Sequence, residues 1–200
     1  ELLQTLALEA STILENARLL EGERSLQRME EEMRIARGIQ ESLLPRHLPS
    51  TGWLRAVGRS VPARQVGGDS FDYFVIGNQR LGFSIGDVSG KGMPAALLMM
   101  TAQGYLRVFC SSDRPLPEKL RQLNQAVVHS AQPGKFITLF YAELDPGDGL
   151  LRYVNAGHNY PLLRRADGSL EPLIEGGLML GFGEDLEFDQ GEASMAPGDS

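Results

Sequence analysis

The first 44 residues contain no proline and repeat apolar side chains at alternating steps of three and four, which constrains them to one long amphipathic helix. One seam runs through Leu3, Leu6, Ala10, Ile13, Ala17 and Leu20, and a second through Leu26, Met29, Met33, Ala36, Gln40 and Leu43. The second seam is offset by two positions, and Gly22 lies between the two. Pro45 and Pro49 end the helical pattern. We expect a coiled-coil-like helix that pairs two copies of the chain, with a solvated helix packed on its own domain as the alternative. Gly22 is either a tolerated helix glycine or a flexible point.

Composition excludes several classes of protein. The 200 residues are 42% hydrophobic, enough for one sizeable core. With 19 basic and 26 acidic residues, a net charge of -7 and no basic cluster, the chain does not fit a nucleic-acid binder. It has no apolar run of the roughly 20 residues that a membrane span needs. The single cysteine, Cys110, excludes an intrachain disulfide and a multi-thiolate zinc site and fits a cytoplasmic protein.

The chain starts with Glu1, without an initiator Met or a basic signal-peptide flank. We therefore expect a fragment of a longer protein.

From residue 51 the pattern changes to strands, glycine-rich turns and two helices. Expected strands are Trp53–Val61, Phe71–Ile76, Arg80–Ile85, Phe136–Leu144, Leu150–Asn155, Tyr160–Arg165 and Ser169–Leu173. Expected helices are Met93–Phe109, with Pro94 in its first turn, and Leu116–Ser130. Strands, a helix pair and further strands favour mixed α/β layers over a βαβ repeat.

Two aspartates flank the tight turn expected at Gly77-Asn78. A two-residue turn pairs residues whose numbers add to 155, so Asp69 falls opposite Gly86 and Asp87 opposite Gly68. The two carboxylates then meet at one end of the hairpin. Close like charges repel unless a cation lies between them, and oxygen ligands favour Mg²⁺ or Mn²⁺. The sequence therefore predicts a divalent metal site; the alternative is that both aspartates only shape turns at strand ends.

Two further motif matches are rejected because the neighbouring residues do not fit the motif. Gly86 to Lys91 lacks the first glycine and the final Ser or Thr of a P-loop. Ser84 stands in a G-x-S-x-G pattern, but strand-like residues continue past it, so the sharp turn of a hydrolase elbow is not expected. His158 is either a structural turn residue or a base or ligand, and Lys91 is either a phosphate contact or an ordinary surface lysine.

Four segments in this order resemble the SpoIIE/RsbU-type serine phosphatases, bacterial members of the PPM, or protein phosphatase 2C-like, class. They are Ala36-Arg-Gly-Ile-Gln-Glu-Ser-Leu-Leu-Pro45, Pro62-Ala-Arg-Gln-Val-Gly-Gly-Asp-Ser-Phe-Asp72, Gly86-Asp-Val-Ser-Gly-Lys-Gly-Met-Pro-Ala-Ala96 and Asn155-Ala-Gly-His-Asn159. The resemblance implies an αββα sandwich with two Mn²⁺ or Mg²⁺ ions that hydrolyses phosphoserine or phosphothreonine on a protein. The implied substrate is a phosphorylated STAS-type anti-anti-sigma factor in bacterial partner-switching control of transcription.

The resemblance also implies roles for individual residues. Asp87 matches the aspartate that bridges two metals, the Val88 carbonyl a further ligand, and Asp69 the carboxylate of the second metal. Asp72 is expected to support these ligands without binding a metal itself. The residues expected to shape the substrate site are Gly90, Lys91 and Gly92.

By the same resemblance, residues 1–25 are the last helix of an upstream, GAF-like sensor, 26–50 a linker and switch, and 51–200 the phosphatase domain. Relatives continue past the Pro197-Gly-Asp199 turn into a strand and a Thr-Asp-Gly motif that complete the metal site. We therefore expect residues 51–200 to lack the end of the domain, and the 200-residue chain can be inactive. The alternative functions are a non-catalytic dimeric signalling module and an unrelated α/β hydrolase that uses Ser84.

Overall fold

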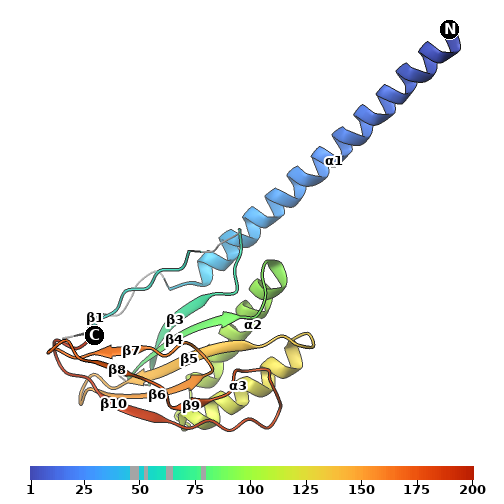
Figure 1. Ribbon diagram of the computed structural model, residues 1–200. Helices are drawn as coiled ribbons and strands as arrows, with labels where there is room; N and C mark the ends of the chain where they lie inside the picture. Colours follow the sequence, from blue (N-terminus) through green and yellow to red (C-terminus); the bar gives the residue numbers. More distant parts are fainter. Residues whose placement is uncertain (46–49, 52–53, 62–64, 78–79) are drawn as a thin grey trace. The chain divides into compact units, whose positions relative to one another are not determined.

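The computed structural model describes residues 1–45, 50–51, 54–61, 65–77 and 80–200, which form two compact units, Glu1–Ile39 and Gln40–Ser200 (Figure 1). The expected long helix is confirmed as α1, Leu2–Leu43. It continues through Gly22 without a break, and a Cβ atom at Gly22 would meet no other atom. Pro45 follows the helix end, whereas Pro49 lies outside the described residues. The division at residues 25 and 50 stays a prediction.

A mixed sheet forms the centre of the second unit. Its strands lie in the order β10 (Gly191–Ser194), β6 (Leu150–Ala156), β5 (Ile137–Leu144), β4 (Arg80–Val88) and β3 (Ser70–Ile76), with β9 (Gly176–Gly177) also paired to β6. These neighbours are antiparallel except for β9, which runs parallel to β6. Helices α2 (Met93–Cys110) and α3 (Leu116–Ser130) pack against each other, as Figure 1 shows. The mixed α/β order expected from the sequence is thus confirmed.

Two short strand pairs accompany the sheet: β1 (Ser50–Thr51) with β2 (Leu54–Arg55), and β7 (Leu162–Arg164) with β8 (Leu170–Pro172). The expected strand Trp53–Val61 is wrong beyond β2, and Trp53 itself lies outside the described residues. Val57 and Val61 are exposed rather than turned to a core. At Gly58 a Cβ atom would lie 2.3 Å from the Phe71 ring, so the chain packs here through a glycine backbone instead of a ladder.

Alternation along the strands produces one apolar core on each face of the sheet. On the helix face, Val88 packs with Leu98, Met99, Leu120 and other side chains of α2 and α3. On the other face, a second cluster contains Phe140, Ala142, Tyr153, Leu163 and Leu173, so that β7 and its flanking chain cover part of that face. Successive strand residues point to opposite faces, so β5 and β6 each contribute side chains both to the face covered by α2 and α3 and to the face covered by β7.

A buried ionic network joins α3 to the sheet. The Lys119 ammonium, with no exposed side-chain surface, pairs with Glu143, which is 2% exposed. Tyr141 Oη donates to Glu143 Oε1 at 2.8 Å, and Arg80 Nη1 donates to Glu143 Oε2 at 3.0 Å. Burial raises the pKa of the nearby Cys110 thiol to about 12, so this thiol stays protonated and unreactive in the folded chain. Each partner in the network offsets the cost of burying the others.

We predict that Lys119→Met destabilises the protein by about 3–5 kcal/mol, because Glu143 loses its closest cation while it remains buried. The midpoint of thermal unfolding should fall by roughly 10 °C, as measured by circular dichroism. Lys91→Met, which removes an exposed ammonium, is the matched control and should change stability by about 0.5 kcal/mol or less. Equal effects of the two substitutions would contradict a structural role for the Lys119–Glu143 pair.

Candidate active site

The register of β3 against β4 brings two aspartates directly opposite each other. Ser70 pairs with Gly86 and Ile76 with Arg80, so the numbers of paired residues add to 156. The register expected from a two-residue turn was therefore wrong by one position, because three residues, 77–79, connect the paired ends. Asn78 of the expected turn lies outside the described residues. Asp69 consequently faces Asp87 rather than Gly86.

The close approach at this position depends on Gly68. The Val88 N–H donates to the Gly68 carbonyl at 3.3 Å, which extends the register beyond the strand. In an antiparallel ladder the next position, Asp69 with Asp87, is then a non-hydrogen-bonded pair, whose side chains come closest together. A Cβ atom at Gly68 would lie 2.9 Å from the Val88 carbonyl oxygen. Any larger residue would push the two strands apart at the aspartates.

The two carboxylates disturb each other. Partial burial raises the pKa of Asp87, and a hydrogen bond and charge repulsion from Asp69 raise it further. Among the described residues, no Lys or Arg forms an ion pair with either aspartate, in contrast to Glu143. An external cation would relieve this repulsion, and carboxylate oxygens suit Mg²⁺ or Mn²⁺. Within the described ranges, no three His, Cys, Asp or Glu side chains gather as a metal cluster, so this pair fits part of a ligand set.

Thr138 and His158 continue the row of polar side chains along the same end of the sheet. Thr138 on β5 pairs with Asp87 in the register, and its hydroxyl lies 2.9 Å from His158 Nδ1. The His158 N–H donates to Asn155 Oδ1 at 2.7 Å. Partial burial lowers the pKa of His158, whereas attraction to Asp69 acts in the opposite direction. His158 is therefore both structurally held and close to the carboxylates, and Thr138, which sequence reasoning missed, follows from the register alone.

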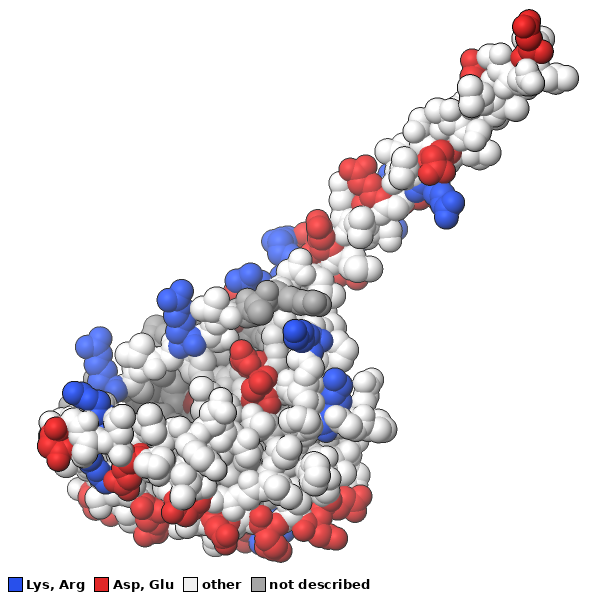
Figure 2. All heavy atoms as spheres, in the orientation of Figure 1, with Lys and Arg blue, Asp and Glu red and all other residues white. Residues whose placement is uncertain are grey.

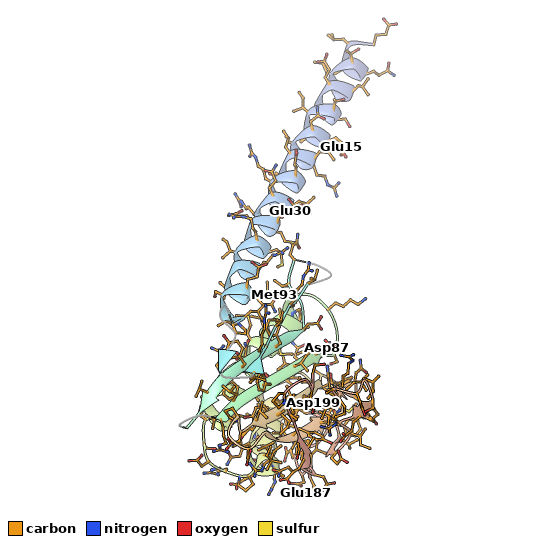
Figure 3. The ribbon with its side chains drawn as sticks, turned by 90° about the vertical axis from the view of Figure 1, so that its left-hand side faces the viewer. Glu15, Glu30, Asp87, Met93, Glu187 and Asp199 are labelled. Atoms are coloured by element: carbon orange, nitrogen blue, oxygen red, sulfur yellow. The ribbon has the colours of Figure 1, made fainter. Side chains whose placement is uncertain are left out.

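The glycine loop before α2 adopts a conformation that requires glycine. Gly90 and Gly92 have φ values of +104° and +74°, in the left-handed region. Lys91 between them is exposed. Lys135, missed in the sequence, donates from Nζ to the Ser89 carbonyl at 3.2 Å and would lie 2.5 Å from a Cβ atom at Gly90. Figure 3 labels Asp87, near the end of β4, and Met93, the first residue of α2.

Asp72 lies on the opposite face of the sheet from the aspartate pair. Three positions separate it from Asp69, and its buried carboxylate accepts hydrogen bonds from Arg107 at 2.6 and 3.0 Å and from Gln103 at 3.2 Å. Both α2 side chains also donate to the Leu43 carbonyl, each at 3.2 Å. Asp72 thus holds α2, whose Gln103 and Arg107 also bond to the end of α1, and its expected support of the metal ligands stays a prediction.

Gln40 connects the end of α1 to the segment that positions Asp69. Its side-chain Nε2 donates to the Gly67 carbonyl at 2.6 Å, and its Oε1 accepts the Gly67 N–H at 3.2 Å. Gly67 stands two residues before Asp69. The heptad analysis assigned Gln40 to an apolar seam and gave no sign of this contact.

One sequence-based exclusion, that of a hydrolase elbow at Ser84, is supported by the structure. Ser84 lies buried in the middle of β4, paired with Asp72 and Tyr141, so it does not stand on a nucleophile elbow. On the visible face of residues 40–200, Figure 2 shows most basic side chains in the upper and left-hand parts and a row of acidic side chains along the lower rim. None of the helices in the described part of the chain has the length and apolar composition needed to cross a membrane.

Residues 77–200 match the family described as Stage II sporulation protein E (SpoIIE). The chain therefore belongs to this family, as a PPM serine phosphatase domain of the SpoIIE/RsbU type that carries a long N-terminal helix.

Among its relatives, phosphoserine phosphatase RsbU of Bacillus subtilis (strain 168) is 30% identical over 174 residues, which cover 86% of this chain and 52% of RsbU. Protein IcfG of Synechocystis sp. is 28% identical over 195 residues, covering 84% of this chain and 31% of IcfG. The chain thus spans about half of RsbU and less of IcfG.

Solved structures support the same fold. The RsbU and RsbW domains of Rv1364c from Mycobacterium tuberculosis match with a TM-score of 0.60 and 32% identity, over 70% of this chain and 38% of that one. The SiaA-PP2C domain of Pseudomonas aeruginosa matches with a TM-score of 0.68 and 19% identity, over 88% of this chain and 70% of that one. The expected PPM-type fold class is confirmed; the described residues contribute its helix pair, its main sheet and short strand pairs on the other face.

We predict that Asp87→Asn raises the thermal stability of the protein without metal and lowers it, relative to wild type, with Mn²⁺. In EDTA at pH 7 the variant should unfold at a midpoint up to about 3 °C higher, because a repulsion worth about 1 kcal/mol or less disappears. Because the folded state raises the pKa of Asp87, this advantage is absent below the unfolded value of about 3.9 and grows as the pH rises through the folded value. With Mn²⁺, wild-type protein should gain stability that the variant lacks.

Differential scanning fluorimetry across pH, with and without Mn²⁺, measures both effects. Asp185→Asn, at an exposed position away from the pair, is the control. An Asp87→Asn variant that is less stable than wild type in EDTA would show that the carboxylates do not repel each other.

Proposed function

We propose that the protein is a metal-dependent phosphatase that removes phosphate from phosphoserine or phosphothreonine in a regulatory protein. The observation that carries the proposal is the direct opposition of Asp69 and Asp87 in a chain of the SpoIIE family. The family match favours a serine phosphatase over other metal-dependent hydrolases.

In this proposal Asp87 would hold both of two Mn²⁺ or Mg²⁺ ions, Asp69 would hold one of them, and the Val88 carbonyl would add a ligand. When bound, such ions supply an activated water and neutralise charge on the phosphoryl group. RsbX, a structural relative with a TM-score of 0.53 and 17% identity over 72% of this chain and 65% of that one, is described in complex with magnesium. That likeness concerns the fold, and the donor chemistry of Asp69 and Asp87 supports the metal assignment here.

The chain's own groups then orient the substrate. The N-terminus of α2 follows Gly90, Lys91 and Gly92, where free amides and the helix dipole attract phosphate oxygens. Lys91 adds a positive charge to that loop. Hydrolysis forms a bond between water oxygen and phosphorus and breaks the bond between phosphorus and the serine oxygen, which leaves as the hydroxyl. The protein forms no covalent intermediate in this scheme.

We further propose that the substrate is a phosphorylated STAS-type anti-anti-sigma factor in a cytoplasmic partner-switching pathway. Support comes from the similarity to phosphoserine phosphatase RsbU and to a protein that combines RsbU and RsbW domains. The alternative is a non-catalytic dimeric signalling module, in which partner binding would not depend on Asp69 or Asp87.

We predict that phosphate release from a phosphoserine protein depends on Mn²⁺ and falls at least about 100-fold in Asp87→Ala and Asp69→Ala. The reaction is followed as inorganic phosphate with the protein at its natural length, beside the 200-residue chain. Asp185→Ala is the matched exposed control and should retain wild-type activity. Binding of the partner without Mn²⁺-dependent phosphate release would favour the signalling module.

We also propose that α1 forms a parallel homodimer through its seams. Apolar seam residues are exposed along the helix: Leu3, Leu6, Ile13, Leu20, Leu26 and Met29. A partner helix would bury them in the manner of a coiled coil. Because the same helix ends in Gln40 and Leu43, which bond to Gly67 and α2, a change in pairing can reach the segment before Asp69.

Single cysteines test this pairing. We predict that Ile13→Cys and Met29→Cys, both on the seams, form disulfide-linked dimers under mild oxidation, whereas Glu15→Cys and Gln27→Cys, two positions away, crosslink much less. Native Cys110 does not interfere, because it is buried and its thiol pKa is raised. The measurement is non-reducing gel electrophoresis. A monomer by sedimentation at high concentration, with no seam preference, would contradict the dimer.

A further inference from the structure

We propose that a surface pocket beside His158 binds an aliphatic side chain of the substrate protein, two or three residues from its phosphoserine. The inference rests on the proposed phosphatase function and adds a specificity site to it. The pocket has a volume of about 330 Å³, and its lining residues are Asn155, Gly157, His158, Asn159, Tyr160, Ile174 and Gly177.

The pocket is continuous with the row of polar side chains at the aspartate pair. Asp87 on β4 pairs with Thr138 on β5, and Thr138 contacts His158, which lines the pocket just after β6. Neighbouring strands lie about 5 Å apart, so the pocket is roughly 10 Å from Asp87. An extended peptide advances about 3.3 Å per residue. A side chain two or three residues from a phosphoserine held at Asp87 therefore reaches the pocket.

The pocket combines a fixed, largely polar floor with two exposed walls that carry apolar surface. Asn155 accepts the His158 N–H at 2.7 Å and donates to the His158 carbonyl at 3.1 Å, which holds the turn in place. A Cβ atom at Gly157 would lie 2.9 Å from the Met179 nitrogen, so the turn also packs closely from behind. The walls are Tyr160 and Ile174, 64% and 52% exposed. A preformed depression with an exposed aromatic wall is typical of an anchor site in protein recognition.

The chemistry of the lining selects the occupant. No Lys or Arg is among the lining residues, so an anionic group would find no opposite charge there. Tyr160 and Ile174 would lose water-exposed apolar surface against Leu, Ile, Val or Met. The exposed Asn159 side chain can donate to and accept from a peptide backbone beside that residue. One aliphatic residue in an extended phosphopeptide meets both requirements.

Two kinds of substrate distinguish binding in this pocket from the hydrolysis step itself. Para-nitrophenyl phosphate is too small to reach it, whereas phosphoserine peptides with Leu, Ala or Asp at each position from -3 to +3 test it directly. With the protein at its natural length and Mn²⁺, we expect kcat/KM to favour Leu over Ala roughly tenfold at one position two or three residues from phosphoserine. In Tyr160→Ala and Ile174→Ala this preference should fall below about twofold, through KM, while hydrolysis of the small ester stays within about twofold.

Val75→Ala is the matched control, since Val75 is an exposed apolar residue near the far end of β3 from Asp69, and it should keep the preference for Leu. The dephosphorylated Leu peptide should inhibit ester hydrolysis competitively in wild type and at least about fivefold more weakly in Tyr160→Ala. Ester hydrolysis by wild type without any side-chain preference, or equal losses on both substrates in the two variants, would overturn the pocket assignment. Wild-type protein that hydrolyses neither substrate would overturn the phosphatase proposal itself.

Discussion

Two carboxylates face each other across one antiparallel strand pair, and the surrounding structure depends on holding them there. Their separation is set by the backbone, because Gly68 permits the approach to Val88 and the next position places side chains closest together. The same unit contains a buried carboxylate, that of Glu143, whose charge is met by Lys119 and Arg80. By contrast, Asp69 and Asp87 form no ion pair with a Lys or Arg of the part of the chain that the structure describes. A divalent cation is the group whose charge and ligand preference suit that pair.

The aspartate pair is supported from segments distant in the sequence. Gln40 at the end of α1 bonds to the backbone of Gly67, and the Leu43 carbonyl accepts hydrogen bonds from Gln103 and Arg107. Buried Asp72 in turn fixes both α2 side chains from the helix face of the sheet. The end of the helix, α2 and the segment before Asp69 thus share one hydrogen-bonded arrangement. In the two proposals, these bonds connect the last residues of α1 to the segment that carries Asp69.

Along the same end of the sheet, the side chains are charged on the β3–β4 pair, polar on β5, and both polar and apolar after β6. The aspartates lie on the β3–β4 pair, Thr138 on β5, and His158 with the walls of its pocket after β6. Such an order suits a phosphopeptide lying across the strand ends, with phosphate at the charged side and an aliphatic residue at the apolar side. Membership of the SpoIIE family supports the proposed phosphatase reaction, and the proposed pocket would help to select the protein substrate.

The sequence by itself determined the long helix, both helices of the second unit, strands β3 to β6 and the family, because these depend on local periodicity, proline and glycine placement, and contiguous motifs. Helix α3 has the predicted bounds, and α2 differs by one residue. The sequence also indicated that Asp69 and Asp87 meet, but only pairing across the whole sheet decided that they are directly opposite. Strands β9 and β10 are short and contain only glycine, alanine and polar residues, so they lack the large apolar side chains by which a strand is predicted from sequence. The roles of Gln40, Asp72, Thr138 and Lys135 were decided by tertiary structure alone, since each depends on a partner that lies far along the chain or on which face of the sheet a side chain takes.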